Sequence, residues 1–199
     1  TRLITHDKAG FSSFRAKYFA DCTGDGDLAE MAGCPMEKGR EEDGAMCPAT
    51  TIFFVDQVDT ARYVAYQNEH QSPKLVEIIN ELKEVGRWPW DFEIFIAIET
   101  PASGTFMVNT IRQIDVDGTD AVSLTRAAME GRGLALELLK VMREYFPGFE
   151  KAHLSRIFDH VGIRETRRIS ARETITLEIA LKGKHNDDCV ASTTYNFDL

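Results

Sequence analysis

The segment whose residue types most directly suggest chemistry is a short turn rich in glycine and aspartate at residues 23–27. The apolar residues 16–20 predict a strand before this turn, and residues 27–32 predict a short helix after it. At a strand-to-helix turn, glycines allow a ligand to approach the backbone, and exposed N–H groups can face a bound oxygen. The pattern therefore indicates a binding turn; an ordinary tight turn capped by aspartate remains the alternative.

Two familiar motifs fit this turn only formally. Residues 24–29 match the dinucleotide pattern G-x-G-x-x-G/A. Asp25 and Asp27, however, would place two carboxylates against a pyrophosphate, and each such pair at ~4 Å costs roughly 1–4 kcal/mol near a surface. A calcium loop fails as well, because Ala29 and Glu30 stand where a third ligand and a glycine belong.

A second candidate is the arginine cluster at residues 164–173, which holds four arginines and two glutamates. Guanidinium groups suit carboxylates and phosphates, so this cluster could hold an anionic substrate or cofactor. The alternative is a set of surface Arg–Glu pairs that contribute little. The preceding turn at residues 161–163 places the cluster at a strand end, which favours an anion-binding role.

Other reactive side chains form no recognisable pattern. The five histidines and four cysteines lack metal-ligand and C-x-x-C spacing, so no metal site is predicted. No serine lies in G-x-S-x-G, so a hydrolytic triad is not supported. Free thiols in a reducing cytoplasm are the simplest interpretation of the cysteines.

Composition narrows the class of protein. The 199 residues can bury a full core, and the net charge of −9 argues against nucleic acid or an anionic membrane as partner. No apolar run approaches the ~18 residues that a membrane-spanning helix needs. The first residue is Thr rather than Met, and residues 196–199 end without a helix cap or polar tail. We therefore expect a piece of a longer protein.

The elements that must position these groups follow from periodicity and turn residues. The pattern predicts a hairpin with its turn at 7–10, a strand at 50–55, helices at 59–68 and 72–85, paired strands at 92–98 and 105–110, a long helix at 123–146, and strands at 155–161 and 174–181. Gly131 and Gly133 inside the long helix cost about 1 kcal/mol each against Ala, so we expect close packing on both. The fold class predicted is α+β, an antiparallel or mixed sheet with helices packed on one side.

Six motifs occur in an order that points to a known family. They are D-C-T-G-D-G-D-L-A, G-R-E-E-D-G, V-N, D-G-T-D, P-G-F-E and G-I-R-E-T-R-R-I, at residues 21–29, 39–44, 108–109, 117–120, 147–150 and 162–169. With these motifs the chain resembles the FAD-dependent oxidoreductases of the glutathione-reductase-like superfamily, related in layout to fumarate reductases.

The resemblance implies a two-domain FAD-binding architecture. Residues 1–48 would be part of the FAD-binding domain, residues 49–182 the substrate domain, and residues 183–199 a return toward the FAD domain. The family's G-x-G-x-x-G turn would precede residue 1.

The resemblance also implies site residues. It places Thr23, Gly24 and Asp25 at the ADP half of FAD. It implies that Asn109 faces the flavin or the substrate, and that Arg164 and Arg167 have catalytic roles. The positive charge of these arginines favours a small anionic substrate.

The functional hypothesis is accordingly a cytoplasmic FAD-dependent oxidoreductase, of which these residues supply the substrate-binding region and part of the flavin site. Alone, without the pyrophosphate-binding turn, they are expected to be inactive. The alternatives are a non-catalytic α+β module that binds a small carboxylate or phosphate through the arginine cluster, and an interaction domain without a site.

Overall fold

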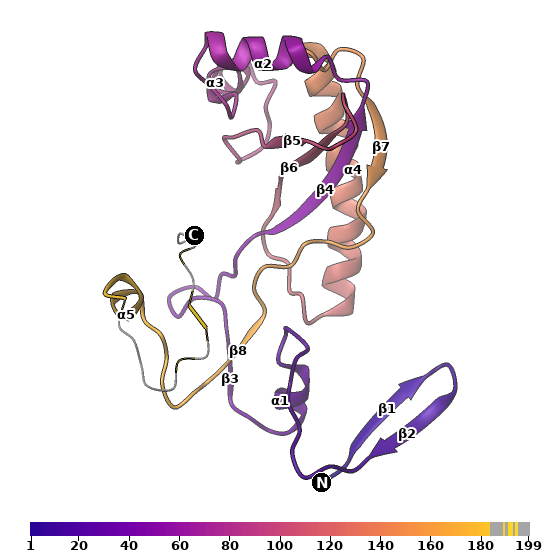
Figure 1. Cartoon of the computed structure of the whole chain (residues 1–199), viewed down its shortest axis with the longest axis vertical. Coiled ribbons are helices and arrows are strands. Elements are labelled where there is room, and N and C mark those ends of the chain that lie inside the picture. The colour runs from indigo at the N-terminus through magenta and orange to yellow at the C-terminus, as the bar shows by residue number, and fades with distance from the viewer. Residues whose placement is uncertain (184–188, 190, 193, 195–199) are drawn as a thin grey trace. The chain divides into compact units, whose positions relative to one another are not determined.

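The computed structural model of the chain describes residues 1–183, 189, 191, 192 and 194 (Figure 1). These form two compact units, which are described separately. The first consists of residues 1–37 and the segment that begins at Arg167, and the second consists of residues 38–166. The domain boundaries expected from the sequence, at 48/49 and 182/183, stay a prediction.

The second unit is built on a four-stranded sheet with the strand order β5-β6-β4-β7. The strands are β4 (Ala49–Asp56), β5 (Ala97–Glu99), β6 (Phe106–Gln113) and β7 (His153–Ile157). All neighbouring strands run antiparallel. β4 is central and alternates strictly between buried and half-buried residues. This period of two means that one face of the sheet is packed and the other is not.

Three helices belong to the same unit: α2 (Thr60–Glu69), α3 (Val76–Glu84) and α4 (Ala121–Tyr145). Asp59 caps α2 by accepting a hydrogen bond from Arg62 N, and Asp120 caps α4 by accepting one from Ser123 N, so that α4 begins two residues earlier than expected. α3 begins later than expected, at Val76, although Ser72 Oγ still accepts from Val76 N. Its apolar stripe is buried as predicted, with Ile78, Ile79 and Leu82 inside the core.

The core lies between these helices and one face of the sheet. Phe53, Val55 and Val108 contribute from the strands and are fully buried. An aromatic cluster completes it, in which Phe95, Phe146 and Phe149 contact one another edge to face. The helices therefore cover one side of the sheet, and the predicted α+β class is confirmed.

Helix α4 runs along the sheet (Figure 1), and its Gly131 lies against Thr51 of β4. A Cβ there would collide with Thr51 Oγ1, which donates a hydrogen bond to Gln113 Oε1 at 2.7 Å. The expectation of close packing is confirmed at Gly131 and wrong at Gly133, where a Cβ would meet nothing within 4 Å.

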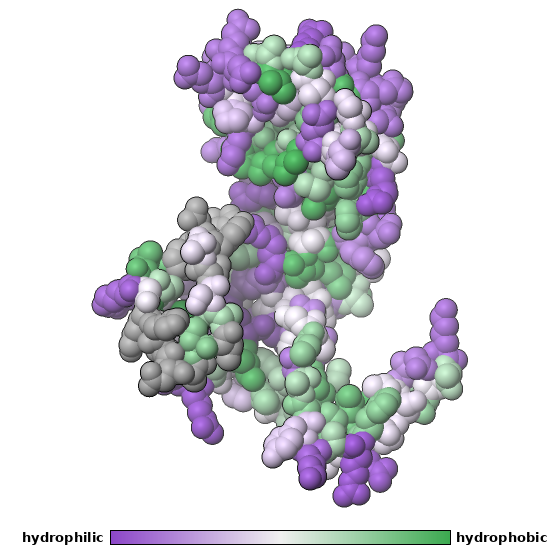
Figure 2. All heavy atoms as spheres, viewed as in Figure 1, coloured by the Kyte–Doolittle hydropathy of each residue, from purple (hydrophilic) through white to green (hydrophobic). Residues whose placement is uncertain are grey.

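The first unit contains short elements only. They are the hairpin β1 (Leu3–Asp7) and β2 (Gly10–Phe14), the helix α1 (Asp27–Met31), the paired strands β3 (Met36–Lys38) and β8 (Arg167–Ile169), and the helix α5 (Leu177–Leu181). Apolar side chains of the hairpin are exposed, and Figure 2 shows them among hydrophilic neighbours. The hairpin turn and α1 were predicted correctly.

Two expected strands are wrong. Residues 16–20 are exposed and form no strand, so the glycine–aspartate turn joins an irregular segment to α1. Residues 174–181 contain the helix α5, because the Thr176 side chain accepts from Ile179 N and starts a helix there. The three-residue strands β3 and β8 were not predicted.

Candidate functional site

The glycine–aspartate turn of the first unit is closed by its own side chains. Asp21 Oδ1 accepts from Thr23 N at 2.9 Å and from Thr23 Oγ1 at 2.7 Å, and Asp21 Oδ2 accepts from Ala29 N at 2.8 Å. Thr23 Oγ1 in turn accepts from Asp27 N at 3.0 Å. Hydrogen bonds from the Thr23 and Ala29 backbone lower the pKa of Asp21. Asp21 thus holds the turn in shape as a carboxylate.

This arrangement does not suit a pyrophosphate. The N–H groups of Thr23, Asp27 and Ala29 already donate within the turn, and α1 is only five residues long. What the turn offers a ligand is open backbone at Gly24. Its φ of 85° favours glycine, and a Cβ there would have no neighbour within 4 Å.

Arg167 of β8 contacts this turn. Its Nη1 donates to Asp27 Oδ1 at 2.5 Å and to the Asp25 carbonyl oxygen at 3.3 Å. The Arg167 side chain is 14% exposed and that of Asp27 is 45% exposed. The structure therefore brings two predicted site residues, Asp25 and Arg167, together in one unit, and gives the Arg167 guanidinium an acidic partner from the turn itself.

The second unit carries Asn109 and Arg164. Asn109 lies on β6 between the buried Val108 and Thr110, so it belongs to the sheet face away from the helices. Its Oδ1 is buried and accepts no hydrogen bond from any described residue. Arg164 is exposed and lies between β7 and β8. Thr23 and Gly24 belong to the other unit.

A small polar cluster next to α4 was missed. Lys38 Nζ donates to Asp117 Oδ2 at 2.8 Å and to Thr119 Oγ1 at 2.5 Å. The hydrogen bond from Lys38, with one from Thr119, lowers the pKa of Asp117 to about 2. These contacts fix the loop before α4, since Asp117 N also donates to Ser123 Oγ.

Beside this loop, Glu165 Oε2 accepts from Cys47 N at 2.8 Å. One glutamate of the arginine cluster thus has a backbone partner outside the cluster. Its role is to tie residue 47 to the segment before β8.

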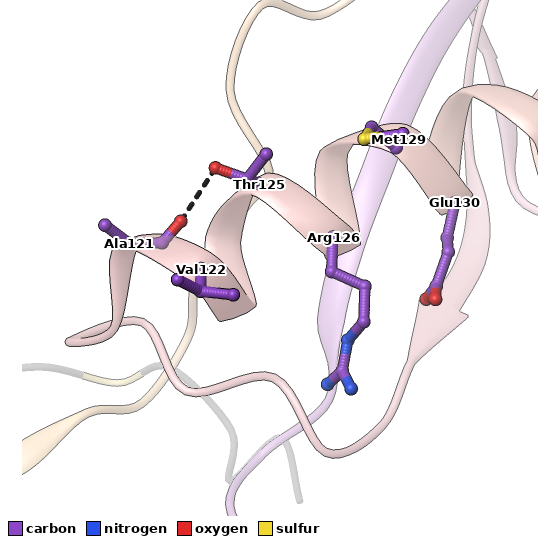
Figure 3. A pocket seen from close by; sticks show the side chains of 6 residues that line it. All are labelled: Ala121, Val122, Thr125, Arg126, Met129 and Glu130. Carbon is purple, nitrogen blue, oxygen red and sulfur yellow. Dashed lines mark hydrogen bonds between the residues drawn. The ribbon is translucent and has the colours of Figure 1, made fainter.

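A hollow lies along the first half of α4 (Figure 3). It is lined by Ala121, Val122, Thr125, Arg126, Met129 and Glu130. All six come from a single helix, and Arg126 Nη2 already donates to the Asp115 carbonyl oxygen at 3.0 Å. Groups from other elements do not converge on the hollow, so it is a weak candidate for a ligand site.

Comparison with known proteins decides the family. The family model described as FAD dependent oxidoreductase matches residues 1–199, the whole chain. The chain belongs to the FAD dependent oxidoreductase family. Searches of curated proteins and of solved structures found no match.

The family confirms the resemblance found in the motifs. A flavoprotein-related, oxidoreductase function follows for this FAD dependent oxidoreductase in general terms. Among the described residues, none of the helices is both long and apolar enough to cross a membrane. In the same part of the chain, His, Cys, Asp and Glu side chains form no group of three that could hold a metal.

Proposed function

We propose that these residues form the substrate-binding region and part of the flavin site of an FAD-dependent oxidoreductase acting on a small, anionic molecule. The pyrophosphate-binding turn would lie in another part of the intact protein, so that residues 1–199 alone are inactive. The family match supports the flavin chemistry. The single structural observation that carries the proposal is the unpaired, buried amide oxygen of Asn109.

Asn109 fits the edge of a flavin or of its substrate. A buried acceptor without a donor costs about 1–3 kcal/mol, so a site that retains one gains when a ligand N–H or O–H reaches it. FAD, when bound, supplies hydride transfer. Asn109 would accept a hydrogen bond at the ring edge and orient it.

Thr23, Gly24 and Asp25 are proposed to lie beside the ADP half of FAD. The open backbone at Gly24 supports this role, because a ligand can come close to it. The closed hydrogen bonds around Asp21 argue that the turn contributes shape rather than N–H donors for phosphate.

Arg164 and Arg167 remain proposed to act on the substrate. Arg167 enters this role already hydrogen-bonded to Asp27, so its guanidinium is oriented before any substrate arrives. No described cysteine forms a disulfide, which favours a reducing compartment, and we propose the cytoplasm.

The test uses protein expressed from the whole reading frame. We expect FAD to copurify, and Asn109→Ala to reduce the flavin affinity or the rate of flavin reduction by substrate at least fivefold, as loss of one hydrogen bond predicts. Asn68→Ala, an exposed amide on α2, is the matched control. Absence of bound flavin, or equal behaviour of the two variants, would overturn the proposal.

A further inference from the structure

The sheet face away from the helices displays two ordered rows of side chains. The register gives a first row formed by Ile98, Met107, Phe54 and Arg156. Backbone hydrogen bonds from Asn109 N to Ile96 O and from Phe158 N to Ile52 O place a second row, formed by Ile96, Asn109, Ile52 and Phe158. We call these eight residues the open face. Six are apolar, one is an amide and one is a cation.

The cation of the open face is held in place by aromatic rings. The Arg156 guanidinium carbon lies 5.0 Å from the ring centroid of Phe54 and 5.2 Å from that of Phe158. The two rings stack on each other at 6.1 Å. Arg156 makes no hydrogen bond or ion pair with the described residues, so its N–H donors are oriented but unused.

Two buried side-chain oxygens on this side of the sheet accept no hydrogen bond from the described residues. Over the described residues, the buried side-chain oxygens without a partner are Asn109 Oδ1 and Asp56 Oδ1, and both lie on this side of the sheet. Asp56 has His153 Nδ1 at 3.9 Å at the far end of β4. Asn109 has no such neighbour and sits in the apolar second row.

The strand spacing of the sheet sets the separation between the Arg156 guanidinium and the Asn109 amide. Because its guanidinium lies over the Phe54 ring, Arg156 reaches across to β4, and Asn109 lies on the next strand, about 5 Å further across the sheet. One row along the strands adds about 7 Å. A ligand the size of one or two fused rings spans this interval over the apolar surface of Ile52 and Met107.

We propose that the open face binds a small carboxylate with a planar apolar body, whose acid group pairs with Arg156 and whose N–H or O–H donates to Asn109 Oδ1. This rests on the proposed function and names the chemistry of its substrate. Charge favours it: the chain carries −9 overall, yet this sheet face presents Arg112 and Arg156, both without an ion pair in the described residues, against the carboxylate of Asp56 at the far end of β4.

The test measures binding to the 199-residue chain by isothermal titration and by amide NMR shifts, without flavin or turnover. The probe is indole-3-acetate, which has a carboxylate, a flat apolar body and an N–H. Indole-3-acetamide removes its charge, and 1-naphthaleneacetate removes its N–H. We expect indole-3-acetate to bind most tightly and to shift the amides of Met107, Asn109 and Phe158.

Variants separate the two contacts. Arg156→Gln should weaken indole-3-acetate roughly tenfold or more and leave the acetamide unchanged, because a charge-assisted pair is lost. Arg156→Lys should keep part of the affinity. Asn109→Ala should weaken indole-3-acetate several-fold and leave 1-naphthaleneacetate unchanged. Arg132→Gln, on α4, is the charge-matched control and should bind like the wild type.

Unchanged thermal melting would show that each variant is folded. Equal affinity of the wild type and Arg156→Gln, shifts elsewhere in the chain, or no binding of the acid by the wild type would overturn this assignment. None of these binding results bears on whether the intact protein holds FAD. The proposed function is therefore judged by the flavin experiments on protein expressed from the whole reading frame.

Discussion

Arg167 Nη1 donates to Asp27 Oδ1 at 2.5 Å, and this bond joins β8 to the first residue of α1 across 140 positions of sequence. The first unit has no long helix or large sheet in its described residues, so a single well-oriented ion pair matters more there than on an ordinary surface. The same contact brings Arg167 of the arginine cluster to the glycine–aspartate turn.

Asp27→Asn should loosen this turn. The mutation keeps the shape but removes the charge facing the mostly buried Arg167, and a charge-assisted hydrogen bond is worth about 1–2 kcal/mol. Hydrogen exchange should become faster at the amides of residues 27–31. Glu30→Gln, in the same helix, is the control and should leave exchange unchanged; equal protection in both variants would contradict the prediction.

Asp21→Asn should disrupt the same turn from its other end. The carboxylate accepts three hydrogen bonds and its pKa is lowered, so the folded turn favours the ionised form. We expect faster exchange at Thr23 N and Ala29 N in the variant, and in the wild type as pH falls below the ordinary aspartate pKa. Asp91→Asn serves as the control. Unchanged exchange at Thr23 N and Ala29 N, both in Asp21→Asn and in the wild type at low pH, would refute this role for Asp21.

Acid should weaken the loop before α4 through Asp117. Its folded pKa of about 2 lies below the ordinary value of 3.8, so its stabilising effect is complete above pH 4 and is lost as pH falls toward 2. After allowance for solvent screening we expect about 1 kcal/mol. Urea unfolding at pH 6 and pH 3 should show a smaller loss for Asp117→Asn than for the wild type; parallel losses would count against the ion pair with Lys38.

Gly131→Ala and Gly133→Ala should have opposite effects. At Gly131 the added methyl meets Thr51 and Gln113, and overpacking of this kind costs about 1–3 kcal/mol. At Gly133 the space is open, so the better helix propensity of Ala should stabilise by about 0.5–1 kcal/mol. Chemical denaturation of the two variants measures both signs, and a shared sign would show that α4 does not pack as described.

Elements with strong local signals were predictable from the sequence. α3 has an apolar stripe with a helical period, and α4 has a capping Asp120 and a terminating Pro147, so their existence did not depend on distant contacts. Residues 16–20 have strand-like composition but no neighbouring strand, and composition without a pairing partner does not make a strand. β3 and β8 are too short to show any period.

The site was predictable only in part. Motifs selected Asn109 and Arg167, but neither the unpaired oxygen of Asn109 nor the contact of Arg167 with Asp27 has a local signal. Arg156 was missed because one of its ring partners, Phe54, comes from a different strand, which the sequence does not place beside it. Arg156 lies in β7 and Phe158 directly follows that strand; the register of β7 with β4 and the ring contacts show that both share a face with Phe54.

The chain enters residues 38–166 directly after Glu37 and leaves them directly before Arg167, and these two points belong to the paired strands β3 and β8. The chain therefore enters and leaves residues 38–166 at two neighbouring points. Such a module can be lengthened, trimmed or exchanged between relatives while both flanks keep their own pairing. Residues 38–166 can therefore change in length or in sequence while the paired strands β3 and β8 stay the same.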